Sequence, residues 1–205
     1  LGGVIEAAGP SGIPLPLTQT EICVAEATKW LQTHVAARGG QPFCLSVHFD
    51  KPHFPICPPP EYFKHYEGRV HLPDLPPGFL AKEVPFVRAA MKCFDICDPE
   101  RKDRAAHERA LAAYCGCIEW VDDAIGRVLA TLDYLGLAEN TLVIYGSDHG
   151  EMAGERGTWQ KSVFYEASAR VPLLMRLPGI TGNGGRRVAT PVGLIDLFPT
   201  FCELA

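Results

Sequence analysis

Helical patterns alternate with short apolar runs along this chain of 205 residues, and the alternation limits the possible folds more than any other feature. The helical patterns cover residues 18–37 and about 98–135, the apolar runs cover 41–49, 140–145 and 171–177, and a strand-to-helix segment follows at 192–204. Such apolar runs are typical of buried strands, and strands that alternate with helices usually form a parallel sheet. We therefore expect an α/β fold with a mainly parallel sheet flanked by helices.

Residues that start and end helices delimit the two helical patterns. Thr18 or Thr20 is the expected N-cap of the first helix, and the glycines at 39–40 end it. Asp98-Pro99-Glu100 indicates the start of the second helix, and Gly136 its end. The expected apolar face of the first helix comprises Ile22, Ala25, Ala27, Trp30, Leu31 and Val35.

Nine prolines between residues 50 and 87 separate these elements. Proline interrupts the hydrogen bonds of a helix interior and of a central strand, so the prolines predict an irregular excursion at about 50–97. Long excursions inside a compact domain are often functional. We expect residues 1–205 to form part of one catalytic domain, with both ends cut.

Composition excludes several classes of function. The net charge is −5 and no basic stripe is visible, which argues against nucleic-acid binding. No run of 18 apolar residues predicts a membrane span, and we expect no membrane partner. The eight cysteines form no CxxC pair, which favours reduced thiols and a cytoplasmic protein. A periplasmic or secreted protein stays open, because a signal peptide could precede Leu1.

Asp148, His149 and Gly150 directly follow the apolar run at 140–145. The carboxyl ends of parallel strands are where α/β proteins bind ligands. A carboxylate beside an imidazole suits a divalent cation, and the flanking glycines allow a sharp turn. By itself the tripeptide fits a capping Asp and a surface His equally well, and two ligands do not complete a coordination sphere.

A second polar cluster follows the apolar run at 41–49. It offers His48, Asp50, Lys51 and His53, and prolines flank His53. A histidine held in this way suits a general acid or an anion contact. The alternative is a capping histidine in a Pro-rich surface loop.

Taken together, these segments resemble the sulfatases of the alkaline-phosphatase superfamily. The similar stretches are 42–63, 114–179 and 194–205, so the resemblance spans most of the chain. The stretches GERGTWQK at 154–161 and EASARVP at 166–172 are most similar to the choline-sulfatase branch. Phosphonate monoester hydrolases share a similar segment.

The resemblance implies roles for four residues. Asp148 and His149 match the second pair of metal ligands, although many relatives have Asn in place of His149. Calcium is the expected metal, with Mg or Mn as alternatives. Lys161 matches a lysine that binds sulfate oxygens, and His53 matches a histidine that contacts the sulfate and protonates the leaving oxygen. The expected substrate is a small sulfate ester, and the full-length parent protein could form homo-oligomers.

Other motifs of the family do not precede residue 41. These are the paired aspartates of the first half of the metal site, a Lys-x-His pair, and the Cys-x-Pro/Ala-x-Arg motif whose cysteine becomes the formylglycine nucleophile. Cys97-Asp98-Pro99-Glu100-Arg101 satisfies the bare nucleophile pattern, but it follows the His53 segment instead of preceding it. We therefore interpret residues 98–100 as a helix start.

Three hypotheses follow. The favoured one is that the parent protein is a sulfuric ester hydrolase that uses a formylglycine and a divalent metal, while this fragment alone is inactive. The second is a phosphonate or phosphate ester hydrolase of the same superfamily. The third is a non-catalytic, degenerate homologue.

Overall fold

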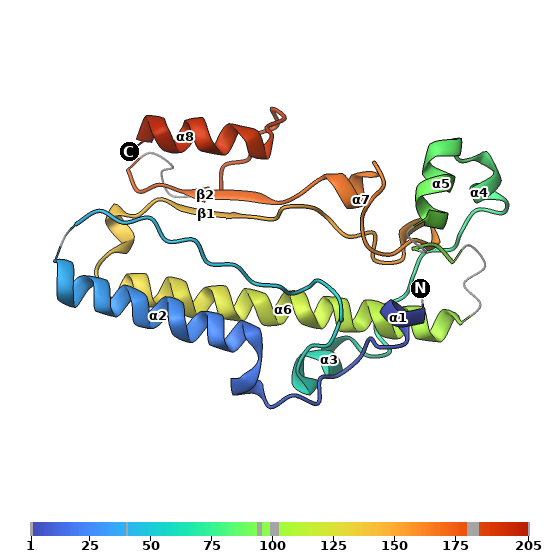
Figure 1. The fold of residues 1–205 in the computed structure, drawn as a ribbon, viewed down its shortest axis with the longest axis horizontal. Coiled ribbons are helices and arrows are strands. Elements are labelled where there is room, and N and C mark those ends of the chain that lie inside the picture. Colours follow the sequence, from blue (N-terminus) through green and yellow to red (C-terminus); the bar gives the residue numbers. More distant parts are fainter. Residues whose placement is uncertain (1, 40, 94–95, 99–102, 180–184, 205) are drawn as a thin grey trace.

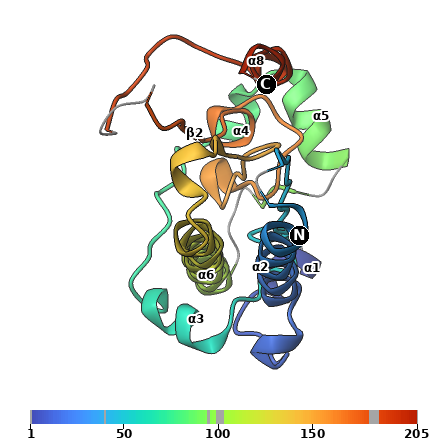
Figure 2. The same ribbon diagram turned by 90° about the vertical axis from the view of Figure 1, so that its left-hand side faces the viewer.

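Two long helices support a short sheet in the computed structural model, which describes residues 2–39, 41–93, 96–98, 103–179 and 185–204. Helices α2 (Gln19–Arg38) and α6 (Arg104–Tyr134) lie side by side, and strands β1 (Val143–Gly146) and β2 (Leu173–Arg176) run along them (Figures 1 and 2). The other helices are α1 (Gly2–Ile5), α3 (Pro60–Tyr66), α4 (Phe79–Lys82), α5 (Pro85–Cys93), α7 (Glu166–Ala169) and α8 (Leu197–Leu204). Single 3₁₀ turns occur at Leu15–Leu17, Ala138–Asn140, Glu155–Gly157 and Leu194–Asp196.

Helix α2 begins as expected, and Ala27 and Leu31 of its expected apolar face are buried. The hydroxyl of Thr18 accepts a hydrogen bond from the backbone N–H of Glu21 at 3.5 Å, so Thr18 is the N-cap. Ile22 and Trp30, expected in the core, are 51% and 39% exposed. The buried residues are Thr20, Val24, Ala27, Leu31 and His34.

Helix α6 begins later than the expected 98–100. Its N-cap is Asp103, whose Oδ1 accepts a hydrogen bond from the N–H of Ala106 at 3.0 Å. Asp98 instead donates its backbone N–H to Gly157 O at 2.8 Å, while Pro99 and Glu100 lie outside the described residues. The helix ends near Gly136, as predicted, and Gly136 has a φ of 70°.

The buried face of α6 carries small side chains that let other elements approach. Ala110, Ala113 and Cys117 are completely buried. Gly116 lies under α3, where a Cβ atom would stand 3.1 Å from the backbone carbonyl of Tyr62. The N-terminal half of α6 therefore packs in one hydrophobic core with residues of α1 and α3 and with the side chain of Trp159.

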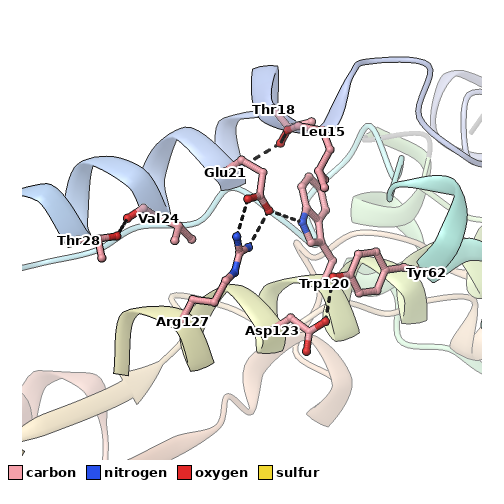
Figure 3. A network of polar contacts seen from close by, with 9 residues as sticks. All are labelled: Leu15, Thr18, Glu21, Val24, Thr28, Tyr62, Trp120, Asp123 and Arg127. Carbon is pink, nitrogen blue, oxygen red and sulfur yellow. Dashed lines mark hydrogen bonds and ion pairs between the residues drawn. The ribbon is translucent and has the colours of Figure 1, made fainter. Parts of the chain in front are cut away.

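A charged network joins α2 to α6 (Figure 3). The guanidinium of Arg127 donates to both carboxylate oxygens of Glu21, at 2.6 and 2.7 Å, and the indole N–H of Trp120 donates to the same carboxylate at 3.1 Å. The hydrogen bonds from Arg127 lower the pKa of Glu21 below its ordinary value of 4.5, although burial opposes this shift. A bidentate pair with a third donor fixes the register of the two helices.

We predict that Glu21→Gln lowers the free energy of unfolding by about 1 kcal/mol near neutral pH, because Arg127 loses its charged partner. A lowered folded-state pKa contributes stability above the ordinary value and loses it as the pH falls through the folded value. The difference between wild type and variant should therefore shrink below about pH 4. Denaturant unfolding at several pH values measures this difference.

Glu26→Gln is the matched control for this prediction. Glu26 lies on the same helix, is 69% exposed and pairs only loosely with Lys29 at 3.8 Å. Its neutralisation should change the unfolding free energy by a few tenths of a kcal/mol or less. An equal effect of the two substitutions would contradict the role that we give to Glu21.

The two described strands are antiparallel, so the expected mainly parallel sheet is not confirmed. Val143 of β1 pairs with Arg176 of β2, and Gly146 pairs with Leu173. Strand β2 lies within the apolar run predicted at 171–177, and β1 overlaps the run at 140–145 and extends one residue beyond it. The run at 41–49 forms no strand with the described part of the chain. An apolar run shows where a strand can form, but it does not give the direction of its partner.

The 41–49 segment is nevertheless extended and packs by alternate residues. Phe43, Leu45, Val47 and Phe49 are half-buried, whereas the residues between them are exposed. The Phe43 ring lies 5.6 Å from the Trp30 ring and 5.2 Å from the His34 ring. In Figure 1 the segment runs between the helix pair and β1, toward the end of the molecule where α6 begins. Residues 50–55, which follow this segment, therefore lie toward the end of the molecule where α6 begins.

The Pro-rich excursion contains α3, α4 and α5, which corrects the expectation of an irregular segment. Pro60 and Pro85 are the first residues of α3 and α5. Proline is tolerated at this position because the first N–H of a helix has no partner inside the helix. The prolines therefore divide this stretch into short helices and do not prevent them.

Candidate functional site

Three segments distant in sequence converge at one place. They are residues 50–55, the turn at 147–150 after β1, and the loop at 151–162. The ammonium Nζ of Lys161 lies 2.7 Å from Nε2 of His53, and the rings of His53 and His149 are 6.3 Å apart between centroids. Three of the four residues that we singled out from the sequence thus meet here, and the fourth, Asp148, adjoins His149.

His53 is held in one orientation. Its Nδ1 lies 2.9 Å from the carbonyl oxygen of Phe54, and its ring stacks on the Phe54 ring at 4.3 Å. Because a carbonyl only accepts, Nδ1 carries the proton, and Nε2 accepts from the ammonium of Lys161. The resting pair therefore consists of a neutral imidazole and a charged lysine that share a hydrogen bond.

Lys51 has a structural position that the sequence did not reveal. Its ammonium donates to Asp50 Oδ2 and to the carbonyl oxygen of Pro55, each at 3.1 Å, and its side chain is 12% exposed. These contacts close the 50–55 loop on itself. Lys51 thus supports the loop around His53, and Lys161 is the cation that contacts the imidazole.

The Asp148-His149 turn presents two donor atoms side by side. His149 Nδ1 donates to the carbonyl oxygen of Gly150 at 2.8 Å, which leaves a lone pair on Nε2. That Nε2 lies 3.6 Å from Asp148 Oδ2. Such a spacing suits two ligands of one cation with bonds of about 2.0–2.6 Å. Within the described ranges no group of three or more His, Cys, Asp or Glu side chains could hold a metal ion.

Gly146 and Gly150, which flank this turn, do not have the role that we predicted for them, which was to allow a sharp turn of the backbone. Gly146 belongs to β1, and a Cβ atom there would make ordinary contacts at 3.5 Å or more. Gly150 packs directly on the α7 segment, where its N–H donates to Ser168 O at 2.8 Å and a Cβ atom would collide with Ala167 O. The φ of Gly150 is not left-handed, so backbone conformation does not require a glycine here. The close approach of the α7 segment does require one, because it leaves no room for a Cβ atom.

Glu151 organises the loop that carries Lys161, a role for which we found no signal in the sequence. Its carboxylate accepts the backbone N–H groups of Ala153, at 3.1 Å, and of Gln160. Burial raises the pKa of Glu151, whereas these two hydrogen bonds lower it. Gln160 and Ser162, on either side of Lys161, have φ values of 64° and 80°. Left-handed backbone at non-glycine residues costs free energy and recurs at functional sites.

Cys97, which satisfies part of the bare nucleophile pattern, lies beside this loop. It forms an antiparallel bridge with Thr158, and burial raises the pKa of its thiol. A raised pKa lowers the fraction of the reactive thiolate. Pro99, Glu100 and Arg101 of the same pattern lie outside the described residues. All eight cysteines are free thiols in the structure.

Residues 10–205 match the sulfatase family. The chain belongs to the sulfatase family. It is 35% identical over 168 residues to the choline-sulfatase of Rhizobium meliloti (strain 1021), a match that covers 80% of this chain and 32% of the relative. It is 33% identical over 199 residues to the arylsulfatase of Clostridium perfringens (strain 13 / Type A), which covers 96% of this chain and 40% of the relative.

Solved structures agree on the architecture. The phosphonate monoester hydrolase of Agrobacterium radiobacter superposes with a TM-score of 0.76 at 26% identity, over 98% of this chain and 41% of that protein. The α/β architecture is thus that of sulfatases and phosphonate hydrolases. The chain spans about a third to two fifths of the length of the relatives that it matches. Among the described residues no helix is long and apolar enough to cross a membrane.

We predict that Gly150→Ala destabilises the protein by about 1–3 kcal/mol, because the methyl group must push the α7 segment away from the 148–149 turn. Gly126→Ala is the control: Gly126 lies inside α6, where a Cβ atom would meet nothing within 4 Å. That substitution should stabilise the helix by about 0.5–1 kcal/mol. Denaturant unfolding measures both variants, and effects of the same sign would contradict the packing at Gly150.

Proposed function

We propose that the parent protein hydrolyses sulfate monoesters and that residues 1–205 are the central and C-terminal part of its catalytic domain. The observation that carries this proposal is the convergence of Lys161, His53 and His149 at the ends of three separate segments. A cationic ammonium, an imidazole and a pair of cation ligands suit a tetrahedral anion that expels an alcohol. A soluble small-molecule sulfate ester is the proposed substrate, and a homo-oligomer the proposed assembly.

Each residue has a proposed role. Lys161 holds the sulfate oxygens and offsets their negative charge. His53 assists departure of the ester oxygen. Because Nε2 of His53 accepts a hydrogen bond in the resting pair, it must first gain a proton, from Lys161 or from solvent, before it can give one to that oxygen.

Asp148 and His149 would hold part of a divalent cation site. Their donor atoms fit such a role by chemistry and by their 3.6 Å spacing. Ca is the proposed metal, because an exposed carboxylate favours a hard cation, with Mg or Mn as alternatives. When bound, the cation would supply electrostatic stabilisation of the anionic centre. The remaining ligands and a formylglycine nucleophile would come from residues outside this chain, as would any additional strands of a mainly parallel sheet.

A second candidate is hydrolysis of phosphonate or phosphate esters. The structural similarity to the phosphonate monoester hydrolase favours it, since the same cationic groups suit a tetrahedral phosphorus centre. Turnover of an aryl sulfate and an aryl phosphonate monoester by the parent protein separates the two. Faster cleavage of the phosphonate would replace our first choice.

For the parent protein acting on an aryl sulfate, we predict that Lys161→Ala lowers kcat/KM by about 10²–10³-fold, the usual effect of removing one donor to a developing anion. Lys29→Ala is the control, because Lys29 is 73% exposed on α2. It should leave kcat/KM unchanged. Equal activity of the Lys161 variant and wild type would remove Lys161 from the mechanism.

The isolated chain of 205 residues should turn over no sulfate ester and should bind Ca²⁺ only weakly. Two protein ligands leave most of the six to eight oxygen positions of Ca²⁺ to water. Isothermal calorimetry with CaCl₂ and a steady-state assay with an aryl sulfate test these expectations. Steady turnover by the chain alone would contradict this prediction and would make Cys97 a candidate nucleophile.

A further inference from the structure

Two buried side chains, Trp159 and His107, and the partly exposed Asp98 lie next to the loop that carries Lys161. The indole Nε1 of Trp159 donates to Nδ1 of His107 at 2.9 Å. Nε2 of His107 lies 3.2 Å from Asp98 Oδ2. Trp159 is completely buried and His107 is 2% exposed. Polar groups buried this deeply are costly unless they are paired, so the contacts between them are specific.

The chemistry of these groups gives the hydrogen bonds one direction. An indole N–H can only donate, so Nδ1 of His107 must accept. The proton of the neutral ring then sits on Nε2, which donates to the carboxylate of Asp98. His107 is thus fixed as a single tautomer between an obligate donor and an acceptor.

The backbone around Trp159 is tied to the same place. Trp159 N donates to Ile96 O and Asp98 N donates to Gly157 O, both at 2.8 Å, on either side of the bridge between Cys97 and Thr158. At Gly157, with a φ of 66°, a Cβ atom would lie 2.7 Å from Asp98 O. The stretch 157–159 is therefore held by residues 96–98 on one side and by α6 on the other.

Lys161 follows two residues after this anchored point. Gln160 between them has a left-handed φ of 64°, and its N–H is bound by Glu151. The path from Trp159 to Lys161 is therefore short and constrained. Nζ of Lys161 lies 2.7 Å from Nε2 of His53.

We propose that His107 and Trp159, with Asp98, are positioning residues that hold Lys161 in register with His53. This inference rests on the proposed role of Lys161 in binding sulfate. Misplacement of a reacting or binding group by about 1 Å can cost up to about 100-fold in rate. Loss of the Trp159–His107 hydrogen bond should therefore reduce catalysis beyond its effect on stability.

Trp159→Phe in the parent protein tests this proposal, with Trp120→Phe as the matched control. Both tryptophans are buried, and each donates its indole N–H to a side chain, but the acceptor of Trp120 is Glu21 on α2. We expect both variants to lose similar thermal stability. Only Trp159→Phe should lower kcat for an aryl sulfate, by about 10–100-fold, and weaken the calorimetric Kd for inorganic sulfate. Equal kcat and Kd in the two variants would overturn the proposal.

His107→Asn and His107→Leu give a second test that does not alter the tryptophan. Asn keeps an acceptor at the place of Nδ1, whereas Leu has none. We expect kcat and sulfate affinity to be reduced less by Asn than by Leu. Equal losses would argue that His107 only fills space.

Lys161→Ala distinguishes a failure of the proposed function of Lys161 from a failure of the proposed positioning by Trp159 and His107. If this variant keeps wild-type turnover and sulfate affinity, the proposed function of Lys161 fails. If it loses both while Trp159→Phe behaves like Trp120→Phe, only the positioning inference fails.

Discussion

Three other parts of the chain are held against helix α6. Helix α3 lies against Gly116, and α2 is held through Glu21 and Arg127. The loop before Lys161 is held through His107 and Trp159. Because each contact uses a different stretch of one rigid helix, their relative positions are fixed by its rise per residue.

The electrostatics of the site follow from one shared hydrogen bond. Lys161 and His53 come from segments that no regular hydrogen-bond ladder joins, yet their nitrogen atoms meet at 2.7 Å. The arrangement leaves the ammonium with further N–H donors for an anion. It also keeps the imidazole neutral beside a positive charge.

The sequence predicted the places of the two long helices, the two described strands and the C-terminal helix. The N-cap at Thr18, the end of α6 near Gly136 and the places of β1 and β2 followed from local patterns. The family resemblance singled out His53, His149 and Lys161, and the structure brings these three side chains together. The antiparallel pairing did not follow from local patterns, because strand direction depends on the path of the connecting chain. The buried roles of Glu151, His107 and Trp159 depend on long-range packing, which periodicity does not encode.

Four non-glycine residues near Lys161 have a left-handed backbone, namely Ala153, Arg156, Gln160 and Ser162. Each such residue stores about 1 kcal/mol or more of conformational strain. Glycine at these positions would relieve the strain, but it would also give the loop many more unfolded and misaligned conformations. The loop at 151–162 is therefore less stable than an unstrained loop would be, but it holds Lys161 in a defined position. This region is where substitutions selected only for thermal stability should most often reduce turnover.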